Sequence, residues 1–437
     1  MIHLLLFALL GTAISAVASL VPALHIYNVA GVVLLFDQAL LSVLTPEELA
    51  FVFLGMVTGY AILNTVPGVL LSVPDESTLF LMLPVQRYLH QGRGYEAIVL
   101  SGIGALGGLG ILLGLAPFAT ILLPAIRAAL QPHFPWMLWA IIAYLLLSEW
   151  PKGTGRPPAG WRRWWEGWKS LFAGMATFAL SGLLGILLVV RPMVGVHIGY
   201  QNLLPAFVGL FAVPWVVQNL LAQTVLPEQR FVREIEAPVR VLATGIFSGM
   251  LGGLFAAFFP VVTGGIGGLL AGQATAQQDE RAFIVSQGAS KVVYYAGGLL
   301  LFFVPGLHLT RGGMAWMLST HYSAYAPQTF YWAAAAVLVS GSVAFLLSLG
   351  LARLMLKLLN RVPYRTLSWI TLCLLLGLVG GLTGYIGLAI CAVASGIGMI
   401  PVLWGARRSH AMGILLLPIA LSMIGADEVL VKWLGLL

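Results

Sequence analysis

Gly11 to Gly31 reads GTAISAVASLVPALHIYNVAG, and Gly249 to Leu269 reads GMLGGLFAAFFPVVTGGIGGL. Each stretch is a glycine-rich apolar run, a proline, a short polar patch and a second apolar run. The prolines, Pro22 and Pro260, and the leading glycines match at one offset of 238 residues. Gly and Pro recur in any helical membrane protein, but their matched order at a constant offset predicts an internal duplication.

An acidic pair follows each of these stretches. Glu47 and Glu48 precede an apolar run that starts at Leu49, and Asp279 and Glu280 precede another run at an offset of 232 residues. Acidic side chains suit a helix N-terminus, where the helix macrodipole favours negative charge. If the number of crossings between the copies is odd, the two repeats are inverted. A substrate would then bind near the membrane midplane, where broken helices of both repeats meet.

The composition of the chain excludes a water-soluble protein. Of 437 residues, 60% are hydrophobic and only 8% are charged, whereas soluble domains have about 25% charged residues. The apolar runs are long and do not alternate, so we expect helices rather than a β-barrel. The predicted fold class is an all-α polytopic membrane protein with two structurally related, inverted repeats and broken or re-entrant helices, in roughly ten to fourteen helical pieces. The net charge of +7 comes from basic residues in short loops, so we expect no nucleic-acid partner.

Basic loops set the predicted orientation and the domain boundaries. Trp150 to Lys169 combines basic residues with a row of tryptophans, which is typical of a cytoplasmic membrane interface. It divides the chain into a first membrane repeat (1–150), a basic aromatic cytoplasmic linker with connecting helices (151–240) and a second membrane repeat (241–437). The basic segment Arg353 to Arg365 is also assigned to the cytoplasm, where its simpler interpretation is a topology signal rather than a specific lipid site.

The two prolines predict sites for an anion. A proline breaks or kinks a helix, and the N-terminus of the half-helix after the break has partial positive charge and unpaired N–H groups that suit a carboxylate or phosphate. The alternative is a structural kink whose backbone groups are satisfied by neighbouring helices. The predicted substrate-binding residues are Pro22, His25, Asn28, Pro260, Thr263, Gly264, Gly265 and Lys291.

The densest polar patch lies between Pro74 and Pro84 in an otherwise apolar stretch. Ionisable groups at membrane depth are costly and usually mark pathways or coupling sites, so a re-entrant loop that binds H⁺ or Na⁺ is predicted here. The alternative is an ordinary loop whose acids cap the next helix. Lys291 would neutralise the anion or pair with an acid, unless it extends to the interface. The predicted ion-coupling residues are Asp75, Glu76, Ser77 and Thr78.

Signatures of other functions are missing from the sequence. No GxSxG nucleophile motif and no GxxxxGKST phosphate loop occurs, so an enzyme or an ATP-driven pump is not expected. His197, His308 and His321 do not have metal-ligand spacing, and the two cysteines lie in apolar segments. We therefore expect no cofactor and no metal, and transport that is passive or driven by an ion.

The same segments resemble a known family. VPALHIYNVA, VPDESTLFLMLPVQRYLHQGRGYEAI, FFPVVTGGIGGLLAG and DERAFIVSQGASKVVYYA occur in this order, and the chain resembles the TctA family, the large membrane subunit of tripartite tricarboxylate transporters, in its short stand-alone branch common in archaea. The resemblance implies a secondary transporter with two related halves. It also implies a carboxylate substrate, because members of this family move carboxylates such as citrate in three-component systems. The family's signatures fall on Pro22 to Asn28, Pro74 to Thr78 and Pro260 to Gly265. Ala23 and Val261 stand where family members often have glycine.

Three functions remain open on the sequence alone. The first is uptake of a small organic anion coupled to H⁺ or Na⁺, with accessory subunits or a second copy of the chain as partners. The second is a flippase for a lipid-linked anion such as a polyprenyl phosphate, which predicts a lateral opening to membrane lipids beside Pro22 and Pro260. The third is a membrane scaffold or enzyme subunit, which predicts no cavity where the repeats meet.

Overall fold

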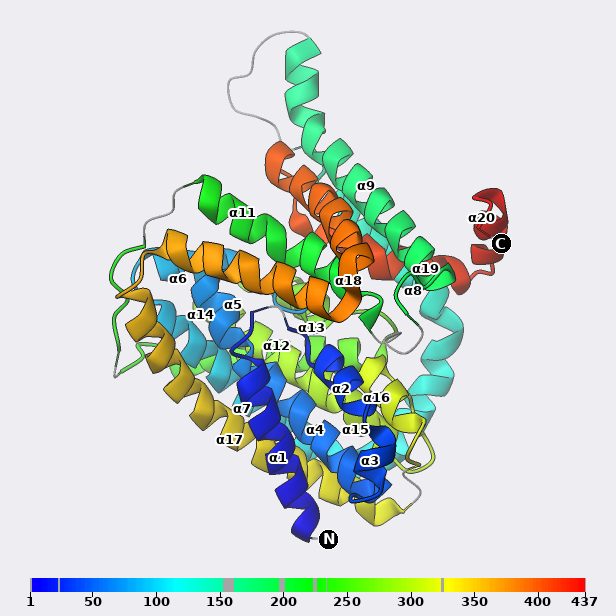
Figure 1. Cartoon of the computed structure of the whole chain (residues 1–437). Coiled ribbons are helices and arrows are strands. Elements are labelled where there is room, and N and C mark those ends of the chain that lie inside the picture. Colours follow the sequence, from blue (N-terminus) through cyan, green and yellow to red (C-terminus); the bar gives the residue numbers. More distant parts are fainter. Residues whose placement is uncertain are drawn as a thin grey trace. The chain divides into compact units, whose positions relative to one another are not determined.

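The computed structural model describes residues 2–22, 24–151, 161–195, 201–222, 226–232, 234–323 and 326–436, apart from the side chains of Arg162 and Arg163. Every regular element in these ranges is a helix, and no strand occurs among them (Figure 1). The prediction of an all-α fold is therefore confirmed. The residues Ala23 and His197, which the sequence singled out, lie outside the described ranges.

The chain divides into two compact units. The first contains Met1–Ala129 and Asn219–Leu374, and the second contains Leu130–Gln218 and Leu375–Leu437. The helices of the first unit are α1 (Ile2–Ala18), α2 (Ile26–Leu34), α3 (Asp37–Leu41), α4 (Pro46–Leu63), α5 (Thr65–Leu71), α6 (Met82–His90), α12 (Val239–Phe258), α13 (Gly264–Ala274), α14 (Glu280–Val292), the π-helix η4 (Val293–Gly297), α15 (Gly298–Phe303), α16 (Gly312–Ser319) and α17 (Pro327–Leu359).

The second unit has its own set of helices, and three helices continue across the boundaries between the units. The helices of the second unit are η1 (Gln131–His133), α8 (Phe134–Leu147), α9 (Trp161–Val190), α10 (Leu204–Phe207), the π-helix η3 (Val208–Ala212), η5 (Arg408–Met412), α19 (Gly413–Ser422) and α20 (Asp427–Trp433). The three that continue are α7 (Gly94–Leu130), α11 (Val213–Leu221) and α18 (Tyr364–Trp404). The boundaries predicted at residues 150 and 240 separate sequence repeats, not the two compact units described here, and they stay a prediction.

Seven helical stretches of the described residues are long and apolar enough to cross a membrane, or up to eight if one bent pair near the C-terminus counts as a span. Pro117 and Pro124 remain inside α7, whereas α18 contains two helices that meet at a kink, where Gly384 has the non-helical dihedral angles φ 66° and ψ −163°. Proline is tolerated within a membrane helix where neighbouring groups satisfy the freed carbonyls, so proline alone marks too many breaks.

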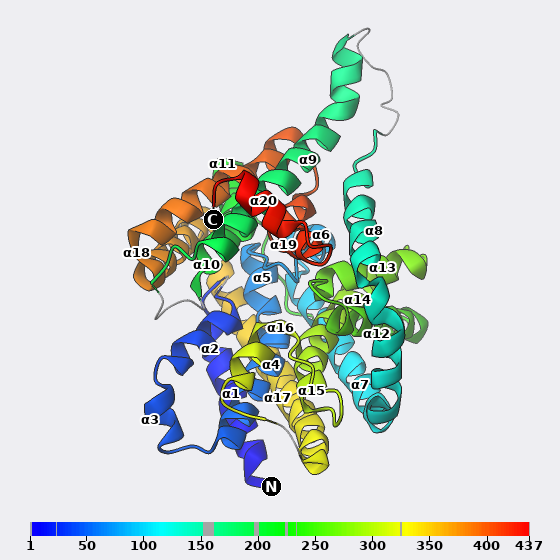
Figure 2. The ribbon, with the colours of Figure 1, turned by 90° about the vertical axis from the view of Figure 1, so that its right-hand side faces the viewer.

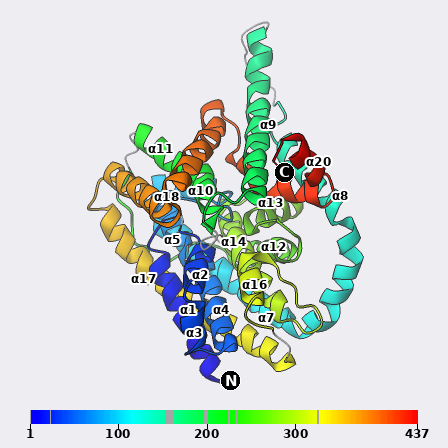
Figure 3. The same cartoon turned by 45° about the vertical axis from the view of Figure 1, so that its right-hand side comes forward.

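Two pairs of helices pack in the same way in the first unit. α1 lies along α4 (Figure 1), and α12 lies along α14 (Figure 2), while α17 passes α1 and α4 (Figure 3). A Cβ on Gly11 would overlap the carbonyl of Val52, and a Cβ on Gly249 would overlap that of Ser286. Small residues at such positions let membrane helices approach closely. These matched pairs support the predicted duplication, which itself stays a prediction.

The acidic pairs lie at helix N-termini, as the sequence predicts. The Thr45 hydroxyl accepts from the backbone N–H of Glu48, and the Glu48 carboxylate accepts from the backbone N–H of Thr45, so the two residues form a capping box at the start of α4. Asp279 caps α14 and accepts a hydrogen bond from the backbone N–H of Arg281. Hydrogen bonds donated by the Arg281 side chain lower the pKa of the Asp279 carboxyl, which keeps a negative charge at this helix start.

The helices end ahead of both signature prolines. α1 ends at Ala18 and α2 begins at Ile26, while α12 ends at Phe258 and α13 begins at Gly264. Val261, next to the second proline, has a backbone φ of 67°, which is a left-handed conformation that strains a β-branched residue. The geometry explains a preference for glycine at this position. That each pair of helices represents one broken span stays a prediction.

Candidate functional site

Asp75 organises the loop between α5 and α6 from its centre. Its Oδ1 atom accepts hydrogen bonds from the hydroxyls of Ser77 and Thr78, both at 2.7 Å, and from their backbone N–H groups at 3.1 and 2.8 Å. Its Oδ2 atom accepts from the Tyr60 hydroxyl at 3.0 Å and from Asn64 Nδ2 at 2.7 Å. Because donors surround both oxygens, this buried carboxylate holds the loop in shape.

Lys291 brings a positive charge to the same carboxylate from α14. Its Nζ atom lies 4.0 Å from Asp75 Oδ2 and 3.5 Å from the Thr65 hydroxyl, and the residue is only 2% exposed. The ammonium also lies 5.6 Å from the centre of the Tyr60 ring, at cation–π range. Lys291 therefore pairs with an acid inside the protein rather than extending to the membrane interface.

Glu76, the neighbour of Asp75, contacts the first proline segment. His25 Nε2 lies 3.1 Å from Glu76 Oε1 and 2.9 Å from the Tyr295 hydroxyl oxygen. The Tyr295 hydroxyl donates to the same Oε1 at 3.0 Å. Because the backbone N–H of Tyr27 donates to His25 Nδ1 at 3.2 Å, the hydrogen-bond network assigns the proton of the neutral ring to Nε2. His25 and Tyr295 thus both donate to Glu76.

The second proline segment contacts the acidic loop as well. Thr263 caps α13, and its hydroxyl donates to the backbone oxygen of Glu76 at 3.4 Å. A Cβ on Gly265 would lie 2.6 Å from the carbonyl oxygen of Ser77, so glycine is needed for the helix to approach the loop this closely. The Gly264 carbonyl accepts from Ser290 at 2.7 Å, which ties the start of α13 to α14.

The caps of two helices therefore meet at Glu76. His25 is the N-cap of α2 and Thr263 is the N-cap of α13, and these residues are separated by the same 238 positions as the two prolines. A helix N-terminus has about half a positive charge from its unpaired N–H groups. Both such ends lie beside the acidic loop, so the protein's own carboxylates occupy an environment suited to anions.

The cluster has little free volume. Its two carboxylates, Asp75 and Glu76, lie beside the Lys291 ammonium and the His25 ring. The adjoining cavity, lined in part by Tyr295 and Arg311, has a volume of about 10 Å³, which is room for about one water molecule. The described conformation is therefore closed around these groups, and this cavity does not admit an organic anion without a rearrangement.

Arg311 is a site residue that the sequence did not single out. Its Nη2 atom donates to the carbonyls of Ala256, Phe259 and Val262 at 3.0, 2.7 and 3.1 Å. These carbonyls lie where Pro260 ends the regular bonding of α12. Tyr60, Asn64 and Tyr295 were also missed. Tyr60 lies on α4 and Asn64 is its C-cap, four residues later, while Tyr295 follows Lys291 by four residues. Residues four apart share one face of a helix, so this spacing was the available signal.

The remaining predicted residues contribute through the backbone. Pro22 and Pro260 stand in the turns that separate the helices, and the N–H of Asn28 donates to the His25 carbonyl at 2.9 Å. Asp37 begins α3, and its carboxylate lies 3.9 Å from His321. The structure thus brings the acidic loop, both proline segments and Lys291 together. Their part in substrate and ion binding stays a prediction.

Comparisons with known proteins agree with this architecture. The family model described as "Tripartite tricarboxylate transporter TctA family" matches residues 5–413. The uncharacterized protein MJ1079 of Methanocaldococcus jannaschii is 24% identical over 428 residues, which cover 96% of this chain and 99% of that protein. No solved structure matches the chain. The family consists of components of membrane transporters, not of enzymes. This chain belongs to the TctA family of tripartite tricarboxylate transporters, and it is a multi-pass membrane protein of membrane transport.

Proposed function

We propose that this TctA-family chain is a secondary transporter that moves an organic anion of the carboxylate type across the membrane together with H⁺. Glu76 is the group that binds the coupling proton in this proposal. The observation that carries it is the meeting of His25, Tyr295 and the caps of α2 and α13 at one buried acidic residue. Buried ionisable residues in membrane proteins are costly and usually belong to the transport pathway.

The hydrogen-bond directions favour a proton over Na⁺. A sodium ion needs several oxygen lone pairs directed at it. The groups around Glu76 Oε1 direct hydrogens at it instead, from His25 Nε2 and from the Tyr295 hydroxyl. Asp75 is surrounded by donors in the same way, so neither acid offers a ready cation cage. A proton on Glu76 needs no such cage and no extra volume.

Coupling follows from competition for the same positive helix ends. While Glu76 is ionised, its charge stands beside the N-termini of α2 and α13 and repels an incoming carboxylate. Protonation of Glu76 removes that charge, and an anion then finds two helix N-termini and the ammonium of Lys291. The closed cluster has to open for this exchange. Binding of the anion and of the proton would therefore favour each other.

The family description also bears on partners. A tripartite transporter has two further components, and we propose that this chain works with accessory proteins, one of which delivers the anion. The substrate class follows from the same description, since tricarboxylates present several carboxylates to the helix ends. Uptake measured with a panel of di- and tricarboxylates identifies which carboxylate the chain transports.

The proposal is tested with the purified chain in proteoliposomes that face either a pH gradient or a Na⁺ gradient. Uptake of radiolabelled citrate and of a panel of di- and tricarboxylates is measured under each gradient. We expect an inward proton gradient to accelerate uptake of at least one carboxylate, with no requirement for Na⁺. Uptake driven by Na⁺ alone would contradict proton coupling. Reorientation of a polyprenyl phosphate, without uptake of any carboxylate, would favour the flippase instead.

A further inference from the structure

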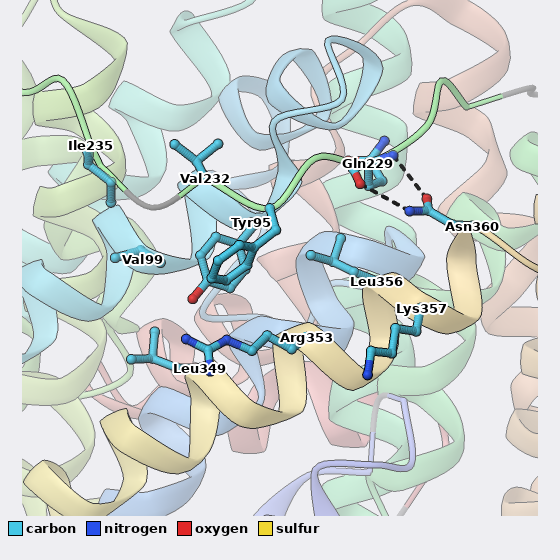
Figure 4. A pocket seen from close by; sticks show the side chains of 11 residues that line it. Tyr95, Val99, Gln229, Val232, Ile235, Leu349, Arg353, Leu356, Lys357 and Asn360 are labelled. Atoms are coloured by element: carbon cyan, nitrogen blue, oxygen red, sulfur yellow. Dashed lines mark hydrogen bonds between the residues drawn. The ribbon is translucent and has the colours of Figure 1, made fainter.

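A second polar site lies in the first unit, apart from the acidic cluster. It is an open groove with a volume of about 810 Å³, bounded by the C-terminal half of α17, the start of α7 and the chain segment near Gln229 (Figure 4). Its size falls in the range of ligand-binding pockets, about 300–1,000 Å³. None of the residues proposed for transport lines it.

Hydrogen bonds fix the position of one wall of the groove. The backbone N–H of Gln229 donates to the Asn360 side chain at 3.0 Å, and Asn360 Nδ2 returns a bond to the Gln229 carbonyl at 3.1 Å, as Figure 4 shows. The Gln229 side chain also donates to the Leu89 carbonyl at 2.8 Å. These bonds hold the segment against the end of α17, so the groove keeps its shape.

The lining divides into a basic part and an apolar part. Arg353 and Lys357 lie one turn apart on α17 and are the charged groups among the described residues of the lining. The Arg353 guanidinium lies 4.9 Å from the centre of the Phe231 ring, which holds it in place. Leu349 precedes Arg353 by one turn on α17, and Val99 of α7 lies across from it (Figure 4). Such a lining fits a molecule with an anionic head and an apolar body.

The position along α17 matches a membrane interface. α17 has 33 residues, about 50 Å at 1.5 Å per residue, whereas the hydrocarbon core is about 30 Å thick. Its basic end is assigned to the cytoplasmic side by the positive-inside rule. Arg353 and Lys357 therefore lie at the level of lipid headgroups, and Leu349 lies one turn nearer the hydrocarbon.

We propose that this groove binds an anionic phospholipid from the cytoplasmic leaflet. The phosphate is held between the Arg353 guanidinium and the Lys357 ammonium, since both are strong partners for phosphate oxygens. The first part of the acyl chain lies along Leu349 and Val99. A free inorganic phosphate would use the basic pair but gain nothing from the apolar wall, so lipid is the occupant that fits the whole groove.

The experiment titrates the purified full chain with phosphatidylglycerol or phosphatidylcholine and counts bound lipids by native mass spectrometry. We expect phosphatidylglycerol to bind more tightly than phosphatidylcholine. The double variant R353Q/K357Q weakens phosphatidylglycerol binding by about 25-fold, because each basic residue near an anionic surface contributes about fivefold. R353K/K357R keeps both charges and retains binding, and thermal unfolding checks that all variants fold.

R361Q/R365Q is the matched control, because it removes the same charge just beyond the end of α17, from residues outside the lining of this groove. It leaves phosphatidylglycerol binding nearly unchanged. An equal loss in the control would show that general surface charge binds the lipid, and it would overturn the proposal. Displacement of the lipid by millimolar inorganic phosphate would overturn it too, because the groove would then bind a free anion.

Discussion

His25 Nε2 lies 3.1 Å from Glu76 Oε1 across 51 positions of sequence, and this contact joins the first proline segment to the acidic loop. The Thr263 hydroxyl connects the second proline segment to the same residue. Glu76 is thus the point at which the two proline segments meet. A change in the charge of Glu76 therefore acts on the N-termini of α2 and α13 at once.

Tyr295→Phe removes one donor to Glu76 while it keeps the ring. Because a hydrogen bond to a charged group contributes about 1.5–3 kcal/mol, its loss weakens the network at Glu76, and we expect slower proton-driven uptake. Tyr294→Phe is the matched control, since the neighbouring ring lies beside Arg311, 5.8 Å from its guanidinium. Uptake by proteoliposomes across a pH series measures both variants. Equal profiles for the two would contradict the role of Tyr295.

Asp75→Asn tests the carboxylate that organises the acidic loop. The amide presents hydrogens to Tyr60 and Asn64, and it leaves the buried Lys291 ammonium without its counterion. Removing one partner of a buried ion pair typically costs about 3–5 kcal/mol, so we expect a clearly lower melting temperature. The more exposed acid Asp37 provides the control, because Asp37→Asn should change the melting temperature little. An Asp75→Asn variant as stable as the wild type would show that the pair does not stabilise the fold.

Gly265→Ala tests the close approach of α13 to the acidic loop. The added Cβ would lie 2.6 Å from the Ser77 carbonyl oxygen, and this backbone atom has to move, so we expect reduced uptake and reduced stability. Gly110→Ala adds the same atom on α7, where nothing lies within 4 Å, and replacement of a helical glycine by alanine there favours the helix by about 1 kcal/mol. Transport and thermal unfolding are compared for the two variants. Equal behaviour would mean that the loop tolerates the displacement.

Val261→Gly and Val261→Ala separate backbone strain from side-chain packing. Val261 is buried and has a φ of 67°. Both variants lose the valine side chain, but only glycine adopts the left-handed conformation without strain, an advantage of about 1–2 kcal/mol. We expect the glycine variant to melt at the higher temperature of the two, the reverse of the usual order in a helix. A more stable alanine variant would show that this backbone is not strained.

The sequence predicted the parts of the site that stand out chemically. Asp75, Glu76 and Lys291 are charged residues in apolar surroundings, and a charge at membrane depth is conspicuous because it is costly. The two proline segments were found because glycine and proline recur at one offset. The all-α fold followed from composition together with the long, non-alternating apolar runs, since a chain in lipid satisfies its backbone groups only in helices or a closed barrel.

The missed residues carry weaker signals. A tyrosine such as Tyr60 or Tyr295 within an apolar helix looks like an ordinary core residue, and only the fold shows that its hydroxyl reaches an acid. Arg311 lies 51 residues beyond Pro260, so its contacts with the carbonyls around that proline depend on tertiary packing.

If Glu76 takes up the proton that accompanies the anion, transport of the anion carries protons into a sealed vesicle. Proteoliposomes with an internal pH dye are given the transported carboxylate without an imposed gradient. We expect the wild type to show substrate-dependent acidification of the interior, and Glu76→Gln, which keeps the size of the side chain but does not ionise, to show none although it folds. Substrate-dependent proton uptake by Glu76→Gln at the wild-type rate would contradict the account.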